Sequence, residues 1–226
     1  MIRETEFSTI EAAANSLAEE LGSILQKAID ATGHAYFAVS GGRTPRFVFS
    51  RLRKMDVDWA RVSITLTDER WVPVRDSHSN ERLVRSQLLQ GAASAATFVP
   101  LYGGESTPEE GLAACEARLA AVGRQLDAVY LGMGRDGHFA SLFPGDPAVD
   151  IRDRLCVAVP ETSYRQGRMS LTASAILAAK KLILLYSGQE KHAVYQEATK
   201  PGPYHDLPLR IVLQQAQTPV EVLQAL

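Results

Sequence analysis

The sequence predicts an α/β fold, a single domain in which a mostly parallel β-sheet is covered by helices on both faces. Short apolar segments alternate along the chain with segments of helical periodicity, which is the order of strand–helix–strand units. The apolar segments are continuous rather than alternating, as expected for strands buried on both faces of a parallel sheet. No Gly/Ser linker, internal repeat or low-complexity tract interrupts the chain, so we expect one domain over residues 1–226.

The predicted elements follow in order along the chain. Ser8 and Glu11 have the spacing of a capping box before an amphipathic helix over residues 9–31. Residues 44–45 and 107–108 each place a threonine cap before a proline, which indicates a helix start. Further helices are expected at residues 80–90, 172–180 and 189–198. Strands are expected at residues 35–39, 62–67, 98–101, 128–131, 155–159, 182–186 and 220–223, with polar loops at 68–78 and 201–208.

Composition limits what the chain can bind. Hydrophobic residues make up 46% and charged residues 22% of the 226, values typical of a packed globular domain. The 24 Lys and Arg against 26 Asp and Glu give a net charge of −2, so no global field attracts nucleic acid or anionic lipid. Any bound anion must therefore be held by a local cluster of groups.

The chain carries no signal for export, for a membrane or for a disulfide framework. Cys115 and Cys156 show neither CxxC nor Cys/His spacing, which predicts reduced core cysteines and no zinc site. The N-terminal segment contains acids and lacks the apolar core of a signal peptide. No run reaches the roughly 18–20 apolar residues of a membrane span, so we expect a cytoplasmic protein.

Three polar segments, two of them rich in glycine, directly follow predicted strands. They are residues 40–44, 68–70 and 132–138. Ligands of parallel sheets bind beyond the carboxyl ends of the strands. We therefore expect the three segments to open on one edge of the sheet and to form a binding site there.

Residues 40–45, SGGRTP, fit either a phosphate-binding turn or a plain strand-to-helix turn with a threonine cap. The two glycines allow close approach of an anion, and the helix start offers free N–H groups at its positive dipole end. No Gly-Lys-Ser/Thr follows, so it is not a Walker loop. A nucleophile elbow, G-x-S-x-G, would make Ser40 a nucleophile. Against this, Ala38 replaces the first glycine, and the next helix begins only at Pro45.

Residues 132–137, GMGRDG, match the GxGxxG pattern, and Asp153 lies 21 residues beyond Gly132. Pro144 follows only seven residues after the last glycine, which leaves no space for the long helix of a dinucleotide site. The sequence therefore predicts no nucleotide cofactor.

His138 is the candidate general base, because an imidazole accepts a proton from water near neutral pH. Asp136 or Asp68 would orient its ring; alternatively, the imidazole only caps a helix or bonds a carbonyl. The other histidines, at positions 34, 78, 192 and 205, lack metal-ligand spacing, so we expect no metal site. Arg168 and Lys191 stand near predicted helix starts and are either exposed bases or a phosphate clamp on residues 40–44.

Six segments in order carry a resemblance that covers the chain nearly end to end. The most specific is LGMGRDGHFASLFPG at residues 131–145. The others are VSGGRTP (39–45), LTDERWVP (66–73), SN (79–80), RMSLT (168–172) and SGQEK (187–191). Together they resemble the glucosamine-6-phosphate isomerase/6-phosphogluconolactonase family.

The resemblance implies a parallel α/β sheet of modified Rossmann type and hydrolysis of 6-phospho-D-glucono-1,5-lactone without metal or nucleotide. His138 would activate water against the lactone carbonyl, with Asp136 and Asp68 beside it, and Arg70 would face the reacting end of the sugar. The residues that would hold the 6-phosphate are Ser40, Gly41, Gly42, Thr44, Arg168 and Lys191. The expected partner is the small phosphorylated sugar lactone alone, bound by a monomer or weak oligomer, with no nucleic acid and no membrane.

Two alternatives remain. The isomerase/deaminase branch has a segment resembling DGHIAFNEP, with a glutamate after the histidine that carries protons. Here residues 139–145, FASLFPG, contain no acid, which favours the hydrolase. A non-catalytic sugar-phosphate sensor would carry an N-terminal DNA-binding module, whereas here the first predicted helix leads straight into the α/β pattern.

His192 stands where the family has a small residue, and Arg43 is at a variable position and receives no role.

Overall fold

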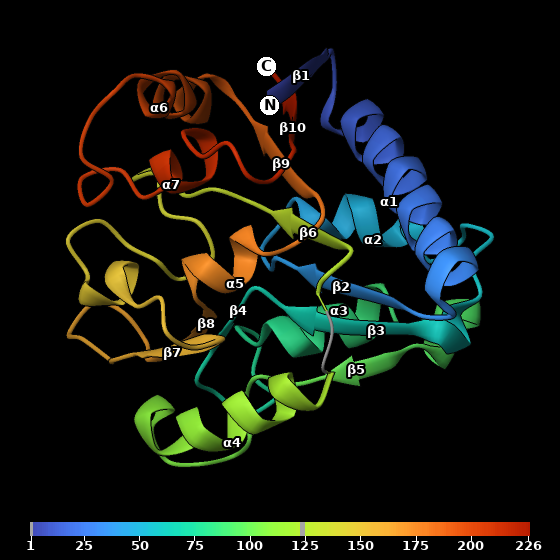
Figure 1. Cartoon of the computed structure of the whole chain (residues 1–226), viewed down its shortest axis with the longest axis horizontal. Coiled ribbons are helices and arrows are strands. Elements are labelled where there is room, and N and C mark those ends of the chain that lie inside the picture. The colour runs from blue at the N-terminus through green and yellow to red at the C-terminus, as the bar shows by residue number, and fades with distance from the viewer. Residues whose placement is uncertain (1, 123–124) are drawn as a thin grey trace.

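Seven parallel strands form the main sheet of the protein (Figure 1). The structure is a computed structural model that describes residues 2–122 and 125–226. The strands are β1 (Ile2–Phe7), β2 (Ala35–Val39), β3 (Val62–Leu66), β5 (Thr97–Val99), β6 (Ala128–Leu131), β9 (Leu182–Ser187) and β10 (Val220–Ala225). They lie in the order β1-β10-β9-β6-β2-β3-β5, and every neighbouring pair is parallel. The predicted parallel sheet is confirmed.

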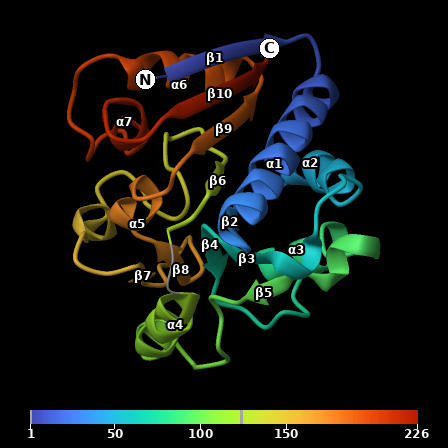
Figure 2. The same ribbon diagram turned by 45° about the vertical axis from the view of Figure 1, so that its right-hand side comes forward.

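Helices cover both faces of this sheet, as predicted. They are α1 (Ile10–Thr32), α2 (Pro45–Leu52), α3 (Asn80–Gln87), α4 (Pro108–Val122), α5 (Ala173–Leu177), α6 (Gln189–Thr199) and α7 (Leu209–Leu213). Figure 2 shows α1 and α2 on one side of the main sheet and α6 and α7 on the other. In β2, Phe37 and Val39 pack into the core formed with α1, and Ala38 packs into the core formed with α6 and α7. This alternation explains why the strand is apolar at every position.

A second, three-stranded antiparallel sheet was not predicted. It consists of β4 (Asp68–Arg70), β8 (Arg168–Leu171) and β7 (Cys156–Val159), in the order β4-β8-β7. Residues 68–78 were expected to be a loop, but residues 68–70 form β4, which the sequence did not indicate because β4 is three charged residues long and carries no apolar pattern. The partner strand of β4 is distant in the chain, since Arg70 pairs with Arg168, 98 residues later. The strand expected at residues 155–159 is present as β7, but it lies in this second sheet. Arg168, expected near a helix start, lies in β8, five residues before α5 begins.

Two helix starts differ in detail from the expectation. α1 is capped by Thr9 rather than Ser8, because the Thr9 hydroxyl accepts a hydrogen bond of 3.1 Å from the Ala12 N–H. Pro45 opens α2 as predicted, but Thr44 has helical backbone angles and its hydroxyl caps nothing. The Thr44 hydroxyl therefore remains free of the helix terminus.

The edge strand β1 and the short helix α7 also escaped prediction. β1 reads IRETEF, and all six of its residues are exposed or half-buried, so it lacks the apolar run that marks the inner strands. No helix in the described part of the chain has the length and apolarity needed to cross a membrane.

Candidate functional site

The carboxyl ends of β6, β2 and β3 meet at one edge of the main sheet, as predicted. Val39 at the end of β2 pairs with the last residue of β3 and with β6. The residues that follow are consequently neighbours. The Ser40 hydroxyl lies 2.9 Å from the Thr67 hydroxyl and accepts a hydrogen bond of 3.3 Å from the Gly132 N–H.

A polar cavity of about 200 Å³ lies at this edge. Nine of the ten predicted site residues line it: Ser40, Gly41, Gly42, Thr44, Asp68, Arg70, His138, Arg168 and Lys191. Asp136, the tenth, contacts His138. The structure thus brings together side chains from both sheets, from α6 and from the loop after β6.

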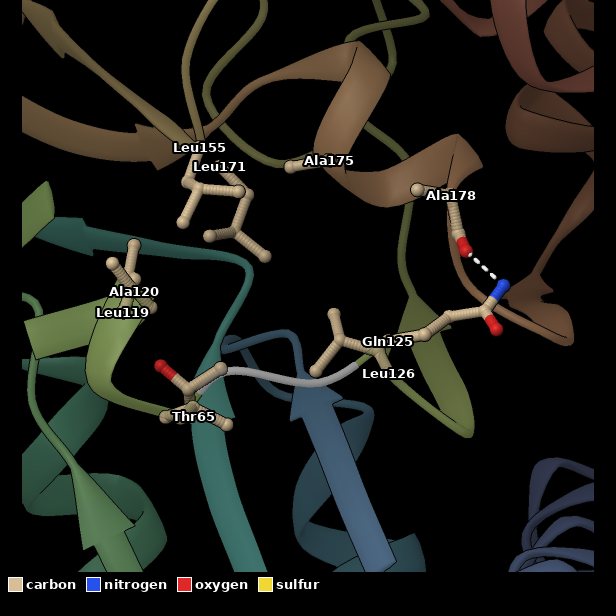
Figure 3. Close-up of a pocket in the computed structure, with 10 residues that line it drawn as sticks. Thr65, Leu119, Ala120, Gln125, Leu126, Leu155, Leu171, Ala175 and Ala178 are labelled. Atoms are coloured by element: carbon tan, nitrogen blue, oxygen red, sulfur yellow. Dashed lines mark hydrogen bonds between the residues drawn. The ribbon is translucent and has the colours of Figure 1, made fainter.

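A larger cavity, of about 330 Å³, lies among α4, α5 and the main sheet (Figure 3). Leu119, Leu155 and Leu171 are among the apolar side chains around it. None of the described residues that line it is ionisable. Burying a phosphate there without a compensating cation would be strongly unfavourable, so it is not a candidate for an anionic ligand.

His138 and Asp136 form a close pair beside the polar cavity. The His138 Nδ1 atom lies 2.6 Å from Asp136 Oδ1. A carboxylate only accepts hydrogen bonds, so Nδ1 carries the proton and Nε2 holds the lone pair. Gly134 makes this approach possible, because a Cβ there would lie 2.2 Å from His138 Nδ1. Of the two predicted partners, the structure pairs Asp136 with the imidazole and not Asp68.

The Asp136 carboxylate stays ionised at neutral pH. Partial burial raises its pKa, but the hydrogen bond from His138 and the charge of that imidazole lower it. The net result is that the pKa of Asp136 lies below its ordinary value.

Asp68 is buried and belongs to a separate cluster. It accepts a hydrogen bond of 2.6 Å from the Ser141 hydroxyl and forms an ion pair with Arg168, whose Nη1 lies 3.4 Å away. Burial lowers the pKa of Arg168, and the Asp68 charge opposes this effect. A guanidinium remains charged in spite of this lowered pKa. Arg168 and Asp68 therefore place one fixed positive and one fixed negative charge in the wall of the cavity.

Arg70 is held in place by α3. Its Nη1 donates to the His78 carbonyl at 2.7 Å and to Asn80 Oδ1 at 3.1 Å. The Asn80 side chain in turn donates to the Asp68 carbonyl at 2.8 Å. A Cβ on Gly41 would lie 1.9 Å from Asn80 Oδ1, so only glycine allows the loop after β2 to approach this network.

Glu69 was missed as a positioning residue. It is 1% exposed, and its carboxylate accepts the backbone N–H groups of Arg70, Asn80 and Glu81, each at 2.7 Å. The Ser79 hydroxyl donates a fourth hydrogen bond at 3.1 Å. Burial raises the pKa of Glu69 to about 7, and the four hydrogen bonds act in the opposite direction. A charged triplet after a strand predicts a solvated surface, and no sequence pattern indicates that Glu69 is buried and accepts these hydrogen bonds.

Lys191 lies in the first turn of α6 and is half-buried. In the part of the chain that the structure describes, no carboxylate pairs with it. Burial lowers the pKa of Lys191, and the charges of Arg135 and Arg43 lower it further. Gly42, with a φ of 108°, occupies a conformation that favours glycine in the adjoining loop. This end of the cavity suits an anion.

The structure bears on three of the competing interpretations. The Ser40 hydroxyl is paired with Thr67 rather than with an imidazole, which disfavours a serine nucleophile. Across the described residues after Gly132, no α-helix begins until Ala173, so a dinucleotide turn is absent there. Among residues 2–122 and 125–226, no group of His, Cys, Asp and Glu side chains is arranged to hold a metal ion.

Comparison with known proteins agrees with the sequence motifs. The family described as glucosamine-6-phosphate isomerases/6-phosphogluconolactonase matches residues 8–221. A 6-phosphogluconolactonase of Rhizobium meliloti is 38% identical over 224 residues, which cover 97% of each chain. One of Mesorhizobium japonicum is 41% identical and covers 94% of this chain and 90% of its own. A crystal structure of a 6-phosphogluconolactonase from Shewanella baltica superposes with a TM-score of 0.96 at 41% identity, covering 100% of this chain and 98% of that one. The chain belongs to the glucosamine-6-phosphate isomerase/6-phosphogluconolactonase family.

Proposed function

We infer that this chain hydrolyses 6-phospho-D-glucono-1,5-lactone to 6-phospho-D-gluconate, with His138 as the general base. The names of the relatives at 38% and 41% identity support the reaction. The observation that carries the mechanism is the His138–Asp136 pair, which leaves a lone pair on Nε2 beside a cavity that also contains Lys191. One base and one anion-binding group are what this hydrolysis requires.

The reaction proceeds by attack of water on the lactone carbonyl. His138 Nε2 takes one proton from the water as its oxygen bonds to the carbonyl carbon, which places a negative charge on the carbonyl oxygen. Arg70 or backbone N–H groups of the loop after β6 stabilise this oxyanion. The ring oxygen then leaves, and the imidazolium returns the proton to it. The products are a free hydroxyl on the opened sugar and a carboxylic acid, which releases its proton to solvent and becomes a carboxylate.

The 6-phosphate binds to the loop after β2 and to the cations of the cavity. We assign it to Ser40, Gly41, Gly42 and Thr44 together with Lys191 and Arg168. The unused hydroxyl of Thr44 and the unpaired ammonium of Lys191 support this assignment among the described residues. The Ser40 hydroxyl, already bonded to Thr67, contributes mainly by shaping the loop.

The deaminase alternative requires an acid that moves protons at an opening sugar ring. Asp68 is the one carboxylate among the described residues that line the cavity. It is tied to Ser141 and Arg168, which removes its freedom to shuttle protons. This contact favours the hydrolase.

A direct test of the function is a lactonase assay on freshly generated 6-phospho-gluconolactone, corrected for spontaneous ring opening. Turnover by the purified chain supports the proposal and excludes a sensor without activity. Binding of 6-phosphogluconate without turnover would support the sensor. Ammonia release from glucosamine 6-phosphate would support the deaminase.

Replacement of Ser40 by Ala tests whether this residue belongs to the phosphate-binding loop or is a nucleophile. We expect KM to rise by about twofold to tenfold, the effect of one lost neutral hydrogen bond, while most of kcat remains. Rapid-quench kinetics should show no burst, and a phosphonate probe should not label Ser40. A trapped acyl-enzyme on Ser40 would overturn the mechanism.

Replacement of Asp136 by Asn tests the orienting carboxylate. We expect kcat to fall by about tenfold, because a charge-assisted hydrogen bond is lost and the amide no longer selects one tautomer. The carboxylate stabilises the protonated imidazole, so without it the acidic limb of the kcat/KM profile should move to lower pH. Since the hydrogen bond and charge of His138 hold the pKa of Asp136 below its ordinary value, the wild-type limb reports the imidazole and not this acid. An unchanged limb would show that the pair does not set the charge of the base.

We further propose that residues 1–226 act as one domain, as a cytoplasmic monomer or weak oligomer whose partner is the small substrate alone. The net charge of −2 supports the exclusion of nucleic acid. Light scattering coupled to size-exclusion chromatography measures the oligomeric state.

A further inference from the structure

Two cations to which the sequence assigned no role, Arg43 and Arg135, lie at or beside the phosphate end of the polar cavity. Arg43, which stands between Gly42 and Thr44, lines this cavity together with Lys191. A second cavity, of about 530 Å³, adjoins it and is lined by Arg43, Thr44, Lys191 and also Arg135. Arg43 and Lys191 therefore lie in the wall that the two cavities share, and Arg135, from a third segment, lines the second cavity beside them.

The positive charges of Arg43 and Arg135 act on Lys191. Burial lowers the pKa of Lys191, and Arg135 and Arg43 each lower it further. Like charges repel, and a bound anion would offset this repulsion. Arg168 and Arg70 line only the first of the two cavities. There Arg168 forms an ion pair with Asp68, and Arg70 donates a hydrogen bond to Asn80.

Among the described residues, one carboxylate, that of Glu190, counters the cluster. Glu190 Oε2 lies 3.1 Å from Arg135 Nε, and both side chains are mostly exposed, at 62% and 70%. In the described part of the chain neither Arg43 nor Lys191 has a carboxylate partner. The cluster thus carries two more positive than negative charges, and a phosphate monoester carries about −1.5 to −2 at neutral pH.

We propose that Arg43 and Arg135 are specificity-determining residues that bind the phosphoryl group beside Lys191, and that Glu190 holds Arg135 only in the empty site. The inference rests on the proposed function, because it names further ligands of the same substrate. A guanidinium offers two parallel N–H donors that match two phosphate oxygens. Glu190 competes with the phosphate for those donors, so the pair must open when the dianion binds.

The test compares charge-matched variants. Arg43→Gln and Arg135→Gln each remove one positive charge, as does the control Lys27→Gln. Lys27 is exposed near the C-terminal end of α1, which leads into the amino end of β2, whereas the site lies at the carboxyl end of that strand. For the phosphorylated lactone we expect KM to rise about threefold to fivefold in each arginine variant, the size of one exposed ion pair, with kcat unchanged. Glu190→Gln should lower KM about twofold to threefold, because the competitor for Arg135 is removed. Lys27→Gln should change neither constant.

Two further readouts distinguish binding from a structural effect. The kcat/KM for unphosphorylated gluconolactone should be the same in all five proteins, since that substrate lacks the group these residues bind. Calorimetric titration with 6-phosphogluconate should reproduce the order of affinities, with Glu190→Gln tightest and the arginine variants weakest. An effect that extends equally to the unphosphorylated lactone would overturn the proposal.

The outcomes separate this inference from the proposed function. If the wild type hydrolyses the lactone but the arginine variants change KM no more than Lys27→Gln does, the inference is wrong and the function stands. If the wild type shows no turnover, the function is wrong, and the titrations with 6-phosphogluconate still decide whether the cluster binds phosphate. Weaker binding by Glu190→Gln would overturn the role assigned to Glu190.

Discussion

His138→Ala is expected to lower kcat by about 10²–10⁴-fold, the usual contribution of a positioned general base. Water is a poor nucleophile until a proton is removed from it, and His138 Nε2 is the lone pair that Asp136 orients beside the cavity. The residual rate should come from substrate binding and from stabilisation of the oxyanion, which the substitution leaves in place. Affinity for 6-phosphogluconate should change little, because the side chains and the loop to which we assign the phosphate are not replaced.

The pH dependence supplies the control for this prediction. Wild-type kcat/KM should fall as pH drops and the imidazole takes up a proton, since only the neutral ring accepts one from water. His138→Ala and His138→Asn should both lack this limb, although the phosphate of the substrate also titrates near pH 6 and will leave its own smaller inflection. Near wild-type kcat in His138→Ala would show that the imidazole is structural and that another group, with Asp68 the first to examine, is the base.

Lys191→Ala is expected to weaken binding of the phosphorylated substrate about 10–100-fold. A charge-assisted hydrogen bond contributes about 1.5–3 kcal/mol, and each 1.4 kcal/mol corresponds to a factor of ten. The effect should fall on KM and on the affinity for 6-phosphogluconate, whereas kcat should remain within a few-fold of the wild type. Unphosphorylated gluconolactone should be a poor substrate for both proteins, with equal kcat/KM.

Arg168→Ala provides the comparison for Lys191→Ala, because both substitutions remove a cation assigned to the phosphate. It should weaken substrate binding by a similar factor, but it also leaves the buried Asp68 without its ion-pair partner. An unpaired buried charge is destabilising, so thermal unfolding should occur at a lower temperature in Arg168→Ala and at an unchanged temperature in Lys191→Ala. Efficient hydrolysis of the unphosphorylated lactone by the wild type would contradict the phosphate clamp for both cations.

Local patterns were sufficient for the main sheet and for the position of the site. Strands buried on both faces must be apolar at every residue, so β2 and β6 could be placed with their observed bounds. The loops that follow such strands lie at one edge of a parallel sheet, which is why nine of the ten predicted site residues line one cavity. The motif around His138 indicated the family before any contact was known.

Contacts between distant segments decided the rest. Whether Asp136 or Asp68 orients His138 could not be predicted, because both acids are compatible with the sequence pattern. The structure pairs Asp68 with Ser141, 73 residues away, and with Arg168, 100 residues away. Those contacts leave Asp136 as the partner of the imidazole.

By itself, the sequence determined the alternation of strands and helices, the edge that carries the site and the residue types available there. The tertiary structure alone decided the second sheet, the burial of Glu69 and the gathering of Arg43 and Arg135 around Lys191. The physical reason is that periodicity reports which side of one element faces solvent. Hydrogen bonds and charge interactions depend on distances between atoms of different elements, and those distances exist only once the elements have packed together.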